Sequence, residues 1–394
     1  MTQLTQMCNA RIILCPFIFR GLIPILSPPY YLQSTFVSPS SLVLPNFCEF
    51  RTKIKMVRRL AISEAESVGG LEFIGFNHDT AVMLSERYDS RDPGDYFGLY
   101  AYVKAHISGL KWNAYGDSFS TLTPAQALNR LGIRQDIQEA ILDPQFDILF
   151  KTQSLHSWLL DTLMKNWGTL CQLLKNETGE EASTRLHEDY TWKTSETLLP
   201  GHTVLYRGQA ATDYYRGPRE FVQEDGSIDL SQIWHFDRGD FNHGSSITYL
   251  TPQYELAELW RSYTARRCKY TETWLIRIQI PNAYLTTLHQ EELWYSPEWL
   301  EAVWYSRRYG EGWFDRFGLS LDLVKGHVCS SLERIFSLEV SDLPHGLQES
   351  DLMRLPSGRN AEQWAFGKCW RREQMSDAVH GKIRIHVHGP RQAL

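Results

Sequence analysis

The sequence predicts an α+β protein in which a helical N-terminal region precedes a mostly β C-terminal half. The clearest helical signal is segment 154–175, where leucine and tryptophan side chains form one continuous apolar stripe at helical spacing. The clearest strand signal is 274–280, where large apolar residues alternate with other residues. Between these segments, residues 177–201 lose the helical period, gain acidic, Thr and Ser residues and end in Pro200-Gly201. We therefore expect a linker there.

Start and stop signals place further helices within 57–176, which we expect to form a helical domain. Thr123 followed by Pro124 is typical of an N-cap and a first helical position, and Gly132 can close that helix. A second short helix is expected over 134–142, where Asp143-Pro144 ends it.

The C-terminal α+β domain is expected over 202–394. The dipeptides Thr251-Pro252 and Ser296-Pro297 predict the starts of two helices. Short apolar or alternating runs predict strands at 203–207, 246–250, 274–280, 321–328, 335–340, 362–366 and 382–388.

The first 55 residues differ in composition from the rest. They contain five basic residues and one acid, so they carry +4, whereas the whole 394-residue chain carries −6. Their apolar run, 12–26, is interrupted by Arg20 and is shorter than the roughly 20 residues of a membrane helix. We expect 1–55 to be a flexible or spurious extension, with translation starting at Met1 or Met56. The alternative is a mitochondrial transit peptide, which is also basic and poor in acids.

Composition limits the partners and the compartment. The chain is 43% hydrophobic and 13% aromatic, which excludes a disordered protein. Mild acidity without a large basic patch predicts no nucleic-acid partner, and no segment predicts a membrane span. The seven cysteines are odd in number, far apart and without a CxxC pair. They argue against a disulfide framework or a zinc site and suit a reducing compartment, so we expect a cytoplasmic protein without a bound metal.

An ordered set of short motifs runs through the C-terminal half. The set is Leu205-Tyr206-Arg207-Gly208, residues 226–231, Arg238-Gly239-Asp240-Phe241, Ile247-Thr248-Tyr249-Leu250-Thr251, residues 323–328 and Glu362-Gln363-Trp364-Ala365-Phe366. Taken together, it resembles an ADP-ribosyltransferase-like domain of a poorly characterised family common in fungi and bacteria. The resemblance covers about residues 203–370 and implies a split antiparallel sheet with flanking helices.

The resemblance also implies NAD as the substrate and names the residues that handle it. Arg207, with the adjacent Gly208, would bind NAD, Tyr249 would line the nicotinamide pocket, and Gln363 or Glu362 would contact the nicotinamide ribose. Breaking the nicotinamide–ribose bond develops positive charge, which a nearby carboxylate stabilises.

The third position decides whether that carboxylate is present. In a strand, Gln363 and Ala365 share one face while Glu362, Trp364 and Phe366 share the other. The large apolar pair is expected to face the core, which leaves Gln363 for the cleft. A neutral amide can orient a ribose but brings no full negative charge to a developing cation.

Three functions follow as hypotheses. The first is an enzyme that transfers ADP-ribose to a protein acceptor or hydrolyses NAD. The alternative is a catalytically inactive nucleotide- or protein-binding module of the same fold. A third, less favoured hypothesis is an Fe(II)-dependent oxygenase, because His235-Phe236-Asp237 has the HxD spacing of a facial triad. The third ligand would then be His327, His386 or His388.

Each candidate residue also has a purely structural interpretation. Arg207 can be an edge-strand arginine that pairs with an acid, Tyr249 a half-buried sheet aromatic, and Gln363 a polar strand residue.

Overall fold

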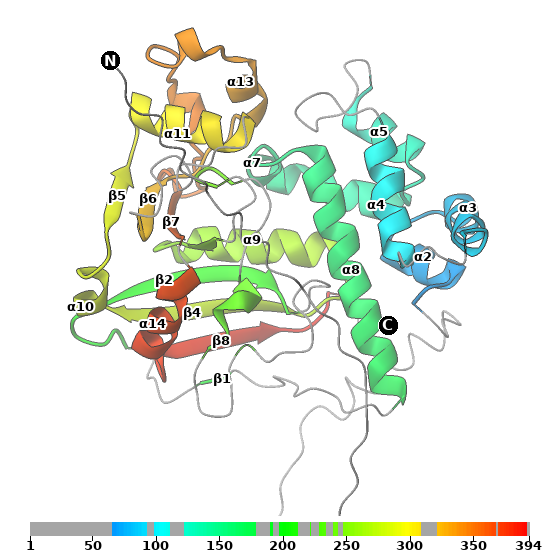
Figure 1. Ribbon diagram of the computed structural model, residues 1–394, viewed down its shortest axis with the longest axis horizontal. Helices are drawn as coiled ribbons and strands as arrows, with labels where there is room; N and C mark the ends of the chain where they lie inside the picture. Colours follow the sequence, from blue (N-terminus) through cyan, green and yellow to red (C-terminus); the bar gives the residue numbers. More distant parts are fainter. Residues whose placement is uncertain are drawn as a thin grey trace, which may run out of the picture. The chain divides into compact units, whose positions relative to one another are not determined.

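Helices form the first part of the described chain, and two β-sheets with flanking helices form the second, so the predicted α+β class is confirmed (Figure 1). The computed structural model describes residues 65–92, 98–110, 122–178, 190–191, 197–211, 221, 228–233, 239–242, 247–308, 321–367 and 369–391. The expected extension 1–55 and the triplet His235-Phe236-Asp237 lie outside these ranges, as does most of the expected linker 177–201.

The helical region begins and ends its helices with the expected local chemistry. Thr123 and Gln126 form a reciprocal capping box, and Gly132 has φ of +70° just after the helix that it closes. The helices of this region are α2 (Val68–Ile74), α3 (His78–Asp89), α4 (Leu99–Gly109), α5 (Pro124–Arg130), α6 (Gln135–Ile141), η1 (Pro144–Phe146), α7 (Asp147–Phe150) and α8 (Leu155–Thr178).

The first sheet is fully antiparallel and has the strand order β1-β8-β4-β2. Its central strand β4 carries the predicted alternation, and Ile276 and Ile278 lie opposite Arg207 and Leu205 of β2. Its strands are β1 (Tyr190–Thr191), β2 (His202–Ala210), β4 (Thr273–Pro281) and β8 (Ile383–His388).

The second sheet has the order β3-β7-β6-β5, and its β5–β6 pair is parallel whereas the expected sheet was antiparallel. Its strands are β3 (Thr248–Leu250), β5 (Gln290–Leu293), β6 (Leu323–His327) and β7 (Glu362–Phe366). The other elements are η3 (Leu230–Ile233), α9 (Tyr254–Arg267), α10 (Asn282–Leu285), α11 (Pro297–Arg308), α13 (Leu332–Ser337), η5 (Val340–Asp342), η6 (Glu349–Asp351) and α14 (Cys369–Val379).

One face of each sheet is buried in a core that the two sheets share. Leu205 and Ile276 of the first sheet and Leu323 and Phe366 of the second belong to the same buried cluster. Helix α9 packs on β2 and β4, and Figure 1 shows it running alongside these strands. Helix α11 contributes Trp299 and other side chains to a separate cluster with the opposite face of the second sheet.

The helical region and the C-terminal half also share a core. The cluster that holds the apolar stripe of α8 includes Leu256 and Tyr263 of α9, and the Tyr263 hydroxyl donates a 2.7 Å hydrogen bond to the carbonyl of Ile141. The Trp158 and Tyr263 rings meet edge to face at 4.9 Å. Contacts from far along the sequence therefore hold α8 against α9.

One predicted strand is wrong. Residues 335–340 are not a strand, because α13 covers Leu332–Ser337 and a short 3₁₀ turn follows it. Leu332, Ile335 and Phe336 are buried at the i, i+3 and i+4 spacing of a helix face. The apolar run that suggested a strand is too short to distinguish the two periods.

Gly208 is expected to resist substitution because the backbone of α9 lies directly against β2 at that residue. An added Cβ would collide with the Ala257 carbonyl oxygen and lie 2.6 Å from the Arg261 backbone nitrogen. We expect Gly208→Ala to lower the free energy of unfolding by about 2 kcal/mol, measured by urea denaturation. Gly109→Ala is the control, because nothing lies within 4 Å of its added Cβ. Equal stability of the two variants would contradict this close approach.

Candidate functional site

The two sheets meet at a two-residue bridge, and a pocket of about 140 Å³ opens beside it. Tyr206 and Thr251 exchange backbone hydrogen bonds of 2.7 and 3.0 Å across this bridge. The pocket is lined by Thr152, Gln153, Tyr206, Arg207, Gly208, Gly239, Asp240, Tyr249, Leu250, Thr251, Leu256, Ala257, Trp260, Arg307, Val328 and Gln363. Four of the five sequence-predicted site residues are in this set.

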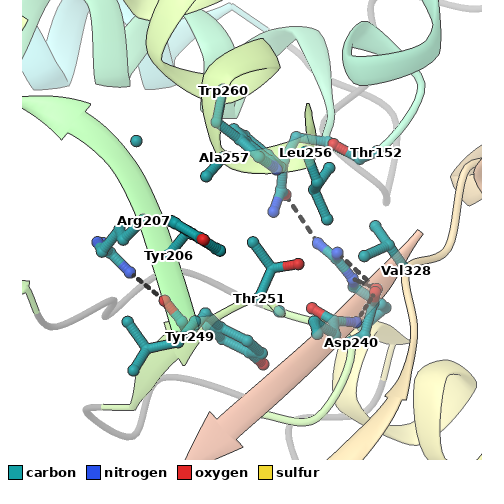
Figure 2. Close-up of a pocket in the computed structure, with 16 residues that line it drawn as sticks. Thr152, Tyr206, Arg207, Asp240, Tyr249, Thr251, Leu256, Ala257, Trp260 and Val328 are labelled. Atoms are coloured by element: carbon teal, nitrogen blue, oxygen red, sulfur yellow. Dashed lines mark hydrogen bonds and ion pairs between the residues drawn. The ribbon is translucent and has the colours of Figure 1, made fainter. Parts of the chain in front are cut away.

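Arg207 lines the pocket but uses its guanidinium group to join neighbouring strands. Its Nε donates to Gln209 Oε1 at 2.8 Å and its Nη1 donates to the carbonyl of Tyr249 at 2.8 Å. Figure 2 shows this bond on one side of Thr251, with Asp240 on the other side. Arg207 therefore holds the start of β3 against β2.

Tyr249 reaches the pocket with its hydroxyl already engaged. The hydroxyl donates to Asn242 Oδ1 at 2.8 Å and accepts from the backbone N–H of Phe241 at 3.1 Å. Burial, together with the nearby Asp240 carboxylate, raises the pKa of Tyr249, so its hydroxyl stays protonated at neutral pH. An added Cβ at Gly239 would collide with this hydroxyl, which explains a glycine there.

Gln363 belongs to a buried polar chain that forms one wall of the pocket. Its Nε2 donates to Asp240 Oδ2 at 2.6 Å and to the His327 carbonyl at 3.0 Å. Asp240 Oδ1 accepts from Arg307 Nη2 at 2.7 Å, and Arg307 Nη1 donates to Gln153 Oε1 at 2.8 Å. The Asp240 and Arg307 side chains are only 1% and 4% exposed. The pocket therefore contains a carboxylate, but a guanidinium group neutralises it.

Glu362 does not line the pocket. It is half-buried, and its backbone N–H donates to Gln253 Oε1 at 2.9 Å. Of the two residues proposed for the ribose contact, the structure brings Gln363 to Arg207, Gly208 and Tyr249 and leaves Glu362 outside.

The opposite wall is apolar and comes mainly from α9. Leu256, Ala257 and Trp260 line it, and the Trp260 ring lies 5.6 Å from that of Trp158 on α8. Tyr206 adds a second ring, which meets Tyr254 edge to face at 5.7 Å. Two aromatic rings on an apolar wall suit a planar ligand.

Sequence reasoning missed several lining residues. Asp240 belonged to one of the motifs that carry the resemblance but was assigned no role, and Arg307 and Gln153 were not singled out. The nearest signal was the pair Arg307-Arg308 at the end of a helix rich in buried aromatics, where one of two adjacent arginines must lie nearer the core. Gln153 had no such signal, since it meets Arg307 across 154 residues of sequence.

The metal hypothesis gains no support from the described residues. Within the described ranges, no group of three or more His, Cys, Asp or Glu side chains could hold a metal ion. Burial lowers the pKa of His327, whose Nδ1 lies 3.3 Å from the Ala361 carbonyl. His386 and His388 lie on β8, opposite Leu275 and Thr273 of β4.

Comparison of the chain with protein-family models, with curated proteins and with solved structures finds no match. Among the helices that the structure describes, none is both long enough and apolar enough to span a bilayer.

Proposed function

We propose that this chain binds NAD or a related nucleotide through an ADP-ribosyltransferase-like site. The observation that carries the proposal is that Arg207, Gly208, Tyr249 and Gln363 line one pocket. Before folding these residues lie on three separate segments, and the resemblance assigned all four to NAD.

The size of the pocket supports one ring rather than a whole dinucleotide. Its volume of about 140 Å³ is close to that of an engineered apolar cavity of roughly 150 Å³ that holds benzene. A nicotinamide ring between the Trp260 wall and the Gln363 wall would have apolar contact on one side and polar contact on the other. The ribose and the phosphates would then lie outside the enclosed volume.

Transfer of ADP-ribose, or hydrolysis of NAD, is the reaction that the resemblance suggests. The developing oxocarbenium ion would be stabilised by negative charge near the ribose. Here Asp240 is paired with Arg307, and Gln363 is neutral. We therefore expect slow turnover.

The second candidate is a catalytically inactive binding module, and the neutralised Asp240 specifically favours it. Gln363→Glu would not supply the missing charge. The new carboxylate would replace an amide nitrogen that lies 2.6 Å from Asp240, and two carboxylates so close share a proton.

NAD binding is tested by calorimetric titration of the full chain, with nicotinamide release followed in parallel. Wild type is expected to bind NAD, and Arg207→Ala to bind it about tenfold more weakly, because the Tyr249 backbone loses the bond that holds it at the pocket. Arg277→Ala is the matched control, since Arg277 lies on adjacent strand β4 and does not line the pocket.

The outcomes separate the candidates. Binding with nicotinamide release supports the enzyme, and binding without release supports the inactive module. If NAD neither binds nor is cleaved, the proposal is wrong. Thermal melting of each variant shows whether it has folded.

A further inference from the structure

The Gln363 side-chain amide is held in one orientation. Both groups that face its Nε2, the Asp240 carboxylate and the His327 carbonyl, can only accept hydrogen bonds. A flipped amide would put Oε1 against two acceptors. The assignment of nitrogen and oxygen in this amide therefore follows from its neighbours.

The groups behind Gln363 are themselves held firmly. The Asp240 side chain is 1% exposed and accepts from Gln363, Arg307 and the Cys329 backbone N–H, the last at 3.0 Å. Arg307 is held in turn by Gln153, which lies between α7 and α8. Gln153, Asp240, Arg307 and Gln363 all line the pocket. A continuous polar chain thus runs from the helical region to Gln363.

This arrangement leaves Gln363 Oε1 as the amide atom available to a ligand. Both hydrogen bonds of the side chain are made by Nε2, and among the described residues Oε1 accepts none. Asp240 and Arg307 neutralise each other, so a ligand that bonds to Gln363 Oε1 meets no net charge from this pair.

We propose that Gln363 Oε1 is a fixed hydrogen-bond acceptor that selects a planar ligand carrying an N–H donor, and that Gln153, Arg307 and Asp240 are its positioning residues. This inference rests on the proposed function in that the nicotinamide ring carries a primary carboxamide. It adds that the carboxamide N–H is recognised by Gln363, and that the helical region takes part in this recognition through Gln153.

The test removes the donor from the ligand without changing its charge. In 3-acetylpyridine adenine dinucleotide a methyl group replaces the amide nitrogen of NAD. Both dinucleotides, and the free rings nicotinamide and 3-acetylpyridine, are titrated into the full chain by calorimetry. We expect each acetylpyridine probe to bind about tenfold more weakly than its carboxamide partner, which is typical of one lost hydrogen bond.

Variants then test whether Gln363 and its positioning residues cause the difference in affinity between the carboxamide and acetylpyridine probes. Gln363→Met is expected to bring the ratio of the two affinities close to one. Gln153→Met is expected to reduce the ratio, whereas Gln153→Glu retains it because it still offers Arg307 an acceptor. Gln135→Met is the control, because the Gln135 side chain pairs with Glu139 at an exposed position outside the pocket.

Failure of this inference is distinct from failure of the proposed function. Equal affinity of wild type for NAD and its acetylpyridine analogue would overturn the inference while NAD binding stands. Discrimination between the free rings without NAD binding would leave the inference standing and overturn the proposed function. If neither ring nor dinucleotide binds, both are wrong. A ratio that Gln153→Met leaves unchanged would remove the positioning role.

Discussion

Arg307→Met is expected to lower the free energy of unfolding by about 4 kcal/mol, since it leaves the Asp240 carboxylate buried without its counter-ion. Asp240 is 1% exposed and its Oδ1 accepts from both Nε and Nη2 of Arg307, at 3.1 and 2.7 Å. Replacing one partner of such a pair costs far more than the pair itself contributes. Urea denaturation of the variant and the wild type measures the difference.

An exposed arginine provides the control for Arg307→Met. Arg354 pairs with Glu349 at 2.7 Å, but these side chains are 57% and 74% exposed. We expect Arg354→Met to change the free energy of unfolding by less than about 1 kcal/mol. Adding Asp240→Asn to Arg307→Met should recover part of the loss, because no isolated charge then remains buried. If Arg307→Met lowers the free energy of unfolding no more than Arg354→Met does, the buried Asp240–Arg307 pair is contradicted.

Asp161→Asn is expected to be the second large effect, at about 3 kcal/mol of unfolding free energy at neutral pH. Asp161 on α8 pairs with Lys165 on the same helix and with Arg267 on α9, whose Nη2 lies 2.9 Å from Asp161 Oδ2. The Arg267 side chain is 1% exposed and stacks near the Trp158 and Tyr263 rings, at 4.6 and 4.5 Å from their centres. The substitution leaves this guanidinium group buried without a carboxylate.

The effect of Asp161→Asn should depend on pH in one direction. Burial alone would raise the pKa of Asp161, but Lys165 and Arg267 outweigh it and hold this pKa well below its ordinary value. The ionised carboxylate therefore stabilises the fold above pH about 4, and this contribution is lost as the pH falls towards the folded-state pKa. The difference in stability between wild type and Asp161→Asn should shrink from pH 7 to pH 3.

Denaturation curves at several pH values test this dependence. Asp147→Asn serves as the control, because Asp147 and Lys151 form an i, i+4 pair whose side chains are 53% and 57% exposed. Its effect should stay below about 1 kcal/mol at each pH. A difference between wild type and Asp161→Asn that grows as the pH falls would contradict the assignment.

Local patterns predicted most of the secondary structure. Three signals each lie within one contiguous segment: the apolar stripe on α8, the alternation on β4 and the capping residues of α5. Within such a segment the backbone geometry sets the spacing of side chains on one face, so the spacing predicts the geometry. The short run at 335–340 failed because so few residues do not separate a helical period from a strand period.

The sequence also predicted which face of a strand each side chain occupies, and this prediction selected Gln363 for the cleft. Alternation along 362–366 put this residue on the face away from Phe366, and Phe366 lies in the core between the sheets while Gln363 lines the pocket. Alternation says nothing of what lies opposite. That Gln363 meets Asp240 across 123 residues of sequence depends on how the two sheets join.

The sequence by itself thus determined the α+β class, the order of most helices and strands, and the proposal that Arg207, Tyr249 and Gln363 belong together. Only the tertiary structure decided which of their atoms remain available. It commits the Arg207 guanidinium group and the Tyr249 hydroxyl to internal hydrogen bonds and pairs Asp240 with Arg307. The physical reason is that buried polar groups must find partners, and those partners come from segments whose proximity no local pattern encodes.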